Sequence, residues 1–100
     1  MTMTPEGKVK AKIIAFLKKV PMCWYFMPIG GAYSQRGIPD IVGHVNGWSF
    51  AIEVKAPSKL TNVTALQDRE LRKIADTGGV ALLVDNVEDV IATFNEKGWI

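Results

Sequence analysis

The dipeptide Asn46-Gly47 constrains the fold more than any other feature of the sequence, because it joins two runs of strand-like composition. The run 40–45 (Asp-Ile-Val-Gly-His-Val) precedes it, and the run 48–55 (Trp-Ser-Phe-Ala-Ile-Glu-Val-Lys) follows it. Both turn residues tolerate the positive φ that a type I′ turn demands, so the pattern predicts a two-residue β-hairpin. A turn this short also determines which residues of the two strands lie opposite each other.

When residues are counted outward from the turn, Val45 lies opposite Trp48 and, at the far end of the hairpin, Asp40 lies opposite Glu53. Two acids from separate parts of the sequence thereby become cross-strand neighbours, with Cβ atoms about 4.5 to 5.5 Å apart. Side chains alternate along a strand, so Lys55 shares the face of Glu53. The register therefore predicts that Asp40, Glu53 and Lys55 converge.

Like charges placed directly across a ladder repel, so the two acids need a compensating partner. A divalent cation is the natural candidate, because two or three protein oxygen ligands completed by waters form the usual Mg²⁺ site. Lys55 would balance the remaining charge or stabilise a negatively charged transition state. The alternative is a solvated polar face in which Lys55 pairs with one acid.

The first third of the chain predicts a helix, a strand and a loop. Thr4-Pro5-Glu6 is a helix start, and apolar residues continue at helical spacing until Pro21. The apolar, aromatic-rich run 22–27 suits a strand. The glycine-containing stretch 29–38 predicts a long loop.

The second half predicts a helix, a strand and a final helix. Thr64 and Gln67 form a capping-box pattern that opens a helix to about Thr77. The wholly apolar run 80–84 is typical of a central strand. Asn86 caps the last helix. The expected order is thus α-β-β-β-α-β-α.

Composition places this order in one small domain. The chain has 100 residues, of which 48% are apolar, and a single cysteine. We expect one soluble α/β domain over 1–100, with a mixed sheet flanked by helices. Cys23 alone can form neither an internal disulfide nor a cysteine zinc cluster.

Membrane insertion and secretion are not expected. The longest mostly apolar stretch, 22–32, contains two glycines and a proline and is shorter than the roughly 18 to 20 residues of a bilayer span. The N-terminus lacks the apolar segment of a signal peptide. We expect no membrane partner and a cytoplasmic location.

Charge is distributed unevenly along the chain. Residues 1–19 hold five lysines and one glutamate, and 55–73 hold five basic and two acidic residues. Residues 74–100 reverse the balance, with one lysine and five acids. A basic surface suits nucleic acid, although solvated helix faces explain the same pattern equally well.

Two further polar residues are predicted to face the carboxylates. Glu6 shares one helix face with Ile13 and Leu17, so it heads the buried stripe. Its alternative role is a favourable charge at the helix N-terminus. Gln67 lies on the inner side of its helix, although the capping box explains it almost as well.

Other residues are assigned structural roles. Trp24, Tyr25 and Phe26 are suited to stacking on bases, but an aromatic strand in a small domain is more often core, which is the interpretation preferred here. His44 shares the face of Asp40 but lies about 13 Å along the strand, too far to join the same metal site. Gly30-Gly31 lacks the ending of a phosphate-binding loop and indicates a flexible loop.

The stretch 36–40 (Arg-Gly-Ile-Pro-Asp), followed after the turn by 52–55 (Ile-Glu-Val-Lys), resembles the PD…ExK signature of the restriction-endonuclease-like superfamily. The chain is similar to the virus-type replication-repair nuclease (VRR-Nuc) domains in three features. These are the Arg-Gly-Ile-Pro-Asp motif, the glutamate in the first helix, and Gln67 after the Glu-x-Lys strand. The similarity covers 6–67 directly, and the element order extends it to about residue 84. The resemblance implies a restriction-endonuclease-like core.

The resemblance also implies a metal-dependent nuclease that hydrolyses phosphodiester bonds in DNA. Asp40 and Glu53 would hold Mg²⁺ or Mn²⁺, with the Val54 carbonyl as a further ligand. Glu6 would bind the metal directly or through water.

The remaining roles follow from the same resemblance. Lys55 would position the attacking water or stabilise the pentacovalent phosphorus, and Gln67 would orient Lys55 or the water. Stand-alone viral members of the family are similar in length and form homodimers that cut four-way junctions. The resemblance therefore implies a homodimer for this chain.

Basic residues on either side of the site are expected to meet backbone phosphates and to supply affinity without reading sequence. These residues are Lys8, Lys12, Arg36, Lys59, Arg69 and Lys73. The expected function is a structure-selective endonuclease that cuts Holliday junctions or other branched DNA. The alternatives are a nuclease for flap, single-stranded or ordinary duplex DNA, and a non-catalytic DNA-binding module of the same fold.

Overall fold

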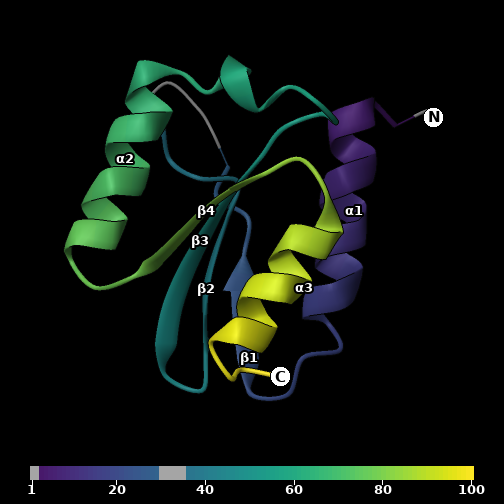
Figure 1. Ribbon diagram of the computed structural model, residues 1–100, viewed down its shortest axis with the longest axis vertical. Helices are drawn as coiled ribbons and strands as arrows, with labels where there is room; N and C mark the ends of the chain where they lie inside the picture. Colours follow the sequence, from purple (N-terminus) through teal and green to yellow (C-terminus); the bar gives the residue numbers. More distant parts are fainter. Residues whose placement is uncertain (1–2, 30–35) are drawn as a thin grey trace.

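The computed structural model describes residues 3–29 and 36–100 (Figure 1). Over these residues it confirms the α/β class and the expected element order, with one short 3-10 helix added before the second α-helix. The elements are α1 (Pro5–Leu17), β1 (Cys23–Phe26), β2 (Ile41–Val45), β3 (Trp48–Val54), η1 (Leu60–Asn62), α2 (Ala65–Asp76), β4 (Val80–Val84) and α3 (Val87–Glu96). Most of the loop predicted over 29–38, including Gly30-Gly31, lies outside the described residues.

The four strands form one mixed sheet in the order β1-β2-β3-β4. The pairs β1-β2 and β2-β3 are antiparallel, and β3-β4 is parallel. Asn46 and Gly47 have φ values of 50° and 87°, as the predicted hairpin turn requires. Ile41 pairs with Ile52, which confirms the predicted register and places Asp40 and Glu53 opposite each other one step beyond that pair.

The sheet carries helices on both faces (Figure 1). α1 packs against α3 and β3, and α2 packs against β3 and β4 from the opposite face. The main core lies between the sheet and the α1-α3 layer, where Ile13, Ile52 and Phe94 are fully buried. Because side chains alternate along β3, the face that receives Glu53 is the other one, beneath α2.

β4 lies at the edge of the described sheet, so the prediction of a central strand for 80–84 was wrong. In the described part of the chain β4 pairs with β3 alone. Its apolar composition has another cause, because α2 and α3 both pack on it. A strand covered on both faces is apolar throughout even when it has one neighbour.

The aromatic run of β1 divides between the two faces of the sheet. Tyr25 packs against the core, in agreement with the core interpretation. That interpretation was wrong for Trp24 and Phe26, which are 54% and 47% exposed. The physical reason is strand alternation: the two residues point to the face of α2, and α2 packs over β3 and β4 rather than over β1.

α1 begins as predicted, since the Thr4 hydroxyl accepts a hydrogen bond from the Gly7 N–H at 3.0 Å. The helix ends at Leu17 rather than continuing to Pro21. The residue before a proline avoids helical geometry, so the chain passes through tighter turns over 18–20. Within residues 3–29 and 36–100, no helix has the length and apolar character needed to cross a bilayer.

Candidate functional site

Two carboxyl groups meet where β2 begins and β3 ends. The Asp40 Oδ2 accepts a hydrogen bond from the Val54 N–H at 2.8 Å, which holds the Asp40 side chain against β3. Glu53 is only 3% exposed and hydrogen-bonds to Asp40. The cross-strand pair expected from the hairpin register is therefore present.

The pKa of Glu53 is raised from 4.5 to about 8. Burial is the largest cause, followed by the charge of Asp40 and the hydrogen bond to it, while Lys55 acts in the opposite direction. Two carboxyl groups this close cannot both ionise freely. In the absence of a cation, Glu53 is therefore mostly protonated at neutral pH.

This raised pKa makes the stability of the metal-free protein depend on pH. Between pH 4.5 and about pH 8, Glu53 keeps a proton in the folded protein and releases it in the unfolded chain. The free energy of unfolding therefore has its full value below this pH range and decreases as pH rises through it. We expect the free energy of unfolding to decrease by up to about 1.4 kcal/mol per pH unit from this residue. Urea titrations at pH 5 to 8 in EDTA measure it, and Glu53→Gln removes this component. Parallel pH profiles of the two proteins would contradict the assignment.

Lys55 and Gln67 complete the cluster on the α2 side. The Lys55 Nζ donates to the Gln67 Oε1 at 2.9 Å and lies 3.7 Å from the Glu53 Oε2. The Gln67 Nε2 donates to the same Glu53 oxygen at 3.1 Å. The amide of Gln67 thus links the acid and the ammonium and restricts the orientation of both.

The predicted capping box is also present, and it uses the same glutamine. The Gln67 N–H donates to the Thr64 Oγ1 at 3.1 Å, and the Gln67 Oε1 accepts from the Thr64 N–H at 3.0 Å. The two interpretations of Gln67 are therefore not exclusive. The cap positions the amide that contacts Glu53 and Lys55.

Gly37 explains why α2 begins next to Asp40. Its φ is +82°, a region that favours glycine, and a Cβ at this position would lie 2.5 Å from the Leu66 carbonyl oxygen. The backbone before Asp40 therefore packs directly on the first turn of α2. This close approach brings Gln67 to the carboxyl pair.

The Val54 carbonyl lacks a donor in the ladder. The hairpin register places Pro39 opposite Val54, and proline has no N–H to donate. The Val54 N–H is satisfied by Asp40 instead of by a backbone carbonyl. Within the part of the chain that the structure describes, the β2-β3 ladder therefore supplies no donor to this carbonyl oxygen, which follows directly after Glu53.

Glu6 lies at the start of α1, and its charge contributes to the raised pKa of Glu53. It does not complete a cluster of three carboxylates. In the two described ranges, 3–29 and 36–100, no group of three or more His, Cys, Asp or Glu side chains is placed to hold a metal ion. Among the described residues, the carboxyl groups brought together at this point are therefore those of Asp40 and Glu53.

Lys10 belongs to the site, although it is not among the site residues predicted from the sequence. Its Nζ lies 3.3 Å from the Asp40 Oδ1. The signal that points to it is helical spacing, since Lys10 follows Glu6 by four residues and so occupies the same face of α1. The charge of Lys10 offsets that of Asp40 in the absence of a cation.

The six basic residues assigned to DNA contact are all exposed. Lys8 and Lys12 follow each other by one turn of α1, and Arg69 and Lys73 by one turn of α2. In Figure 1, α1 and α2 stand on opposite sides of the end of the sheet at which β3 finishes. Arg36 and Lys59 lie in connecting segments.

Comparison with known proteins found no match: no family model, no curated protein and no solved structure is significantly similar to this chain.

Proposed function

We propose that this protein is a metal-dependent endonuclease that hydrolyses phosphodiester bonds in DNA. The observation that carries the proposal is the buried Glu53, which is hydrogen-bonded to Asp40 and contacts Lys55 and Gln67. Keeping the buried Glu53 protonated at neutral pH costs stability relative to an exposed carboxyl, and a bound cation would offset this cost by favouring its ionised form. Its resemblance to the PD…ExK signature supports a restriction-endonuclease-like, VRR-Nuc-type assignment.

The donor set fits Mg²⁺ or Mn²⁺. Mg²⁺ is usually bound by one or two carboxylates, keeps several waters and adds substrate phosphate oxygens, so it does not need an all-protein cage. Asp40, Glu53 and the Val54 carbonyl would hold the ion, with Glu6 acting through water. When bound, the metal would polarise the phosphate and acidify a water molecule.

Lys55 would act on the reacting phosphate. Because Gln67 holds its ammonium group beside Glu53, Lys55 is oriented before the substrate arrives. It would position the attacking water or stabilise negative charge as it develops on phosphorus. This chemistry needs no side-chain nucleophile.

The proposed substrate is branched DNA, including four-way junctions. The exposed basic residues of α1 and α2 flank the site and would bind phosphates, which gives affinity for backbone shape rather than for base sequence. Paired incision of two strands needs two copies of the single site, so the proposal includes a homodimer.

A substrate panel tests the proposal. Four-way junction, flap, single-stranded and duplex DNA are incubated with the protein in Mg²⁺, Mn²⁺ or EDTA, and sedimentation gives the stoichiometry of the complexes. We expect metal-dependent incision with preference for the junction and two protein chains per junction. Binding without incision of any substrate in either metal would support the non-catalytic alternative. A complex with one protein chain per junction would contradict the proposed homodimer.

A further inference from the structure

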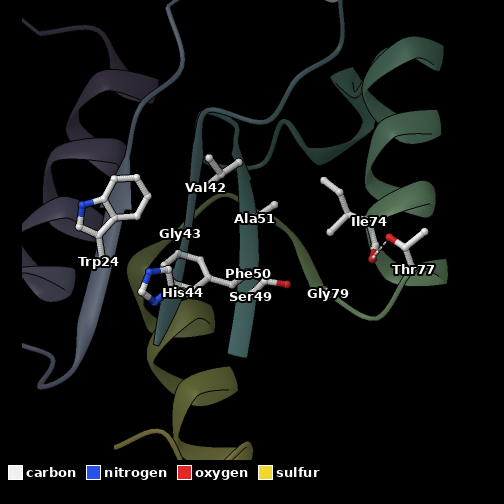
Figure 2. Close-up of a pocket in the computed structure, with 10 residues that line it drawn as sticks. All are labelled: Trp24, Val42, Gly43, His44, Ser49, Phe50, Ala51, Ile74, Thr77 and Gly79. Carbon is white, nitrogen blue, oxygen red and sulfur yellow. Dashed lines mark hydrogen bonds between the residues drawn. The ribbon is translucent and has the colours of Figure 1, made fainter. Parts of the chain in front are cut away.

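A groove of about 400 Å³ opens on the face of the sheet that carries Asp40 and Glu53 (Figure 2). Figure 2 shows Trp24 of β1 on one side of it and, on the other, Ile74 of α2 and Thr77 just after that helix, with strands β2 and β3 between them. Its volume lies within the range of small-ligand sites. The groove exists because α2 covers only part of this face.

The β1 wall of the groove is aromatic and exposed. Trp24 pairs with His44 across the β1-β2 ladder, and their ring centroids lie 5.7 Å apart with planes inclined by 22°. Phe26 extends the same surface, with its ring centroid 5.5 Å from that of Trp24. More than half of Trp24 is exposed to solvent. These rings therefore present aromatic surface that the protein leaves partly uncovered, although His44 stacks on Trp24.

The floor of the groove is formed by small, uncharged side chains. Val42 and Ala51 form a cross-strand pair on the floor, and Ser49 supplies a hydroxyl at its rim. Of the described residues that line the groove, none is Asp, Glu, Lys or Arg, and His44 is the one side chain there that can carry a charge. A flat, uncharged heterocycle therefore has both an apolar floor and a stacking wall there.

The groove and the carboxyl pair lie on the same face of the sheet, although Asp40 and Glu53 are not among the residues that line the groove. Along β2, Val42 lies on this face between His44 and Asp40, and along β3 Ala51 precedes Glu53 in the same way. Asp40 and His44 are about 13 Å apart along the strand. A nucleotide close to the scissile phosphate can span this distance.

We propose that the groove binds an unpaired nucleobase of the DNA substrate, stacked on Trp24, while the neighbouring backbone enters the carboxyl site. This inference rests on the proposed nuclease function and adds the substrate feature that the site selects. Stacking on aromatic side chains tolerates every base, so the groove recognises an unpaired position rather than a sequence. It thereby favours branched or bulged DNA over fully paired duplex.

The experiment uses the full chain in EDTA and a four-way junction with one unpaired 2-aminopurine at its branch point. We expect binding to quench the probe fluorescence, and Trp24→Ala to abolish the quenching and to weaken binding about tenfold. Trp24→Phe retains most of both effects. Trp48→Ala is the matched control, because Trp48 is also exposed, at 60%, but lies beside the hairpin turn and outside the groove.

Unchanged quenching and affinity in Trp24→Ala would overturn the inference. So would a concentration-dependent self-association that Trp24→Ala removes, since a second copy of the chain would then cover the groove. Cleavage in Mg²⁺ separates the two proposals. Trp24-dependent quenching without cleavage would refute the nuclease and keep the base site, and cleavage without such quenching would refute the base site alone.

Discussion

Asp40→Asn is expected to lower kcat for cleavage of branched DNA in Mg²⁺ by about 10³-fold. The amide oxygen of asparagine can still accept the hydrogen bond that Asp40 receives from the Val54 N–H, so β3 and the turn before β2 keep their positions. What the variant loses is one negative charge on the ion. Metal stabilisation of the transition state amounts to several kcal/mol, and each 1.36 kcal/mol is tenfold in rate.

Single-turnover cleavage of the junction measures this effect, with Asp76→Asn as the matched control. Asp76 is exposed at the end of α2, and the same substitution there leaves the site untouched. Urea titration of both variants shows whether either has lost stability. If folded Asp40→Asn cleaves the junction within about tenfold of the wild-type rate, Asp40 has no catalytic role.

The second large effect is expected for Glu53→Gln, which separates metal binding from folding. Glutamine resembles the protonated glutamic acid that the raised pKa of Glu53 favours at neutral pH. It can also accept the hydrogen bond from the Gln67 Nε2. We therefore expect the stability of the metal-free variant to equal or exceed that of the wild type at pH 7 and above, because the neutral amide does not titrate, whereas the wild type loses stability as pH rises toward the raised pKa of Glu53.

Metal affinity changes in the opposite direction. A neutral amide is a much weaker ligand for a hard cation than a carboxylate, so we expect Mn²⁺ binding to weaken by about 100-fold or more. Calorimetric titration with Mn²⁺ measures the loss, and Glu96→Gln near the end of α3 is the control. Equal Mn²⁺ affinity in Glu53→Gln and wild type would contradict the assignment of Glu53 as a metal ligand.

The parts of the site that sequence could predict are those set by local geometry. A two-residue turn determines its own register, and this alone places Asp40 opposite Glu53. A capping box likewise determines the orientation of a single side chain, that of Gln67. In both cases the relevant contacts lie within a few residues of the signal or follow from it by counting.

The features that sequence did not predict depend on how the elements pack. Lys10 reaches Asp40 because of the way α1 packs on the sheet, and no local pattern specifies that packing. The edge position of β4 cannot be recognised from its sequence, because two helices cover this strand and make it apolar throughout although it has one neighbouring strand in the described sheet. Trp24 is exposed because α2 stops short of β1. Composition alone describes a residue as apolar but does not say which face stays uncovered.

The most direct test of the account is anomalous scattering from crystals soaked in Mn²⁺. We expect one peak in contact with a carboxylate oxygen of Asp40 and a carboxylate oxygen of Glu53, with the Val54 carbonyl oxygen as a further ligand. Lys10 moves away from Asp40 as the ion takes over its charge. A protein that has no peak at this position, or whose two carboxyl groups point away from a common ion, contradicts the account.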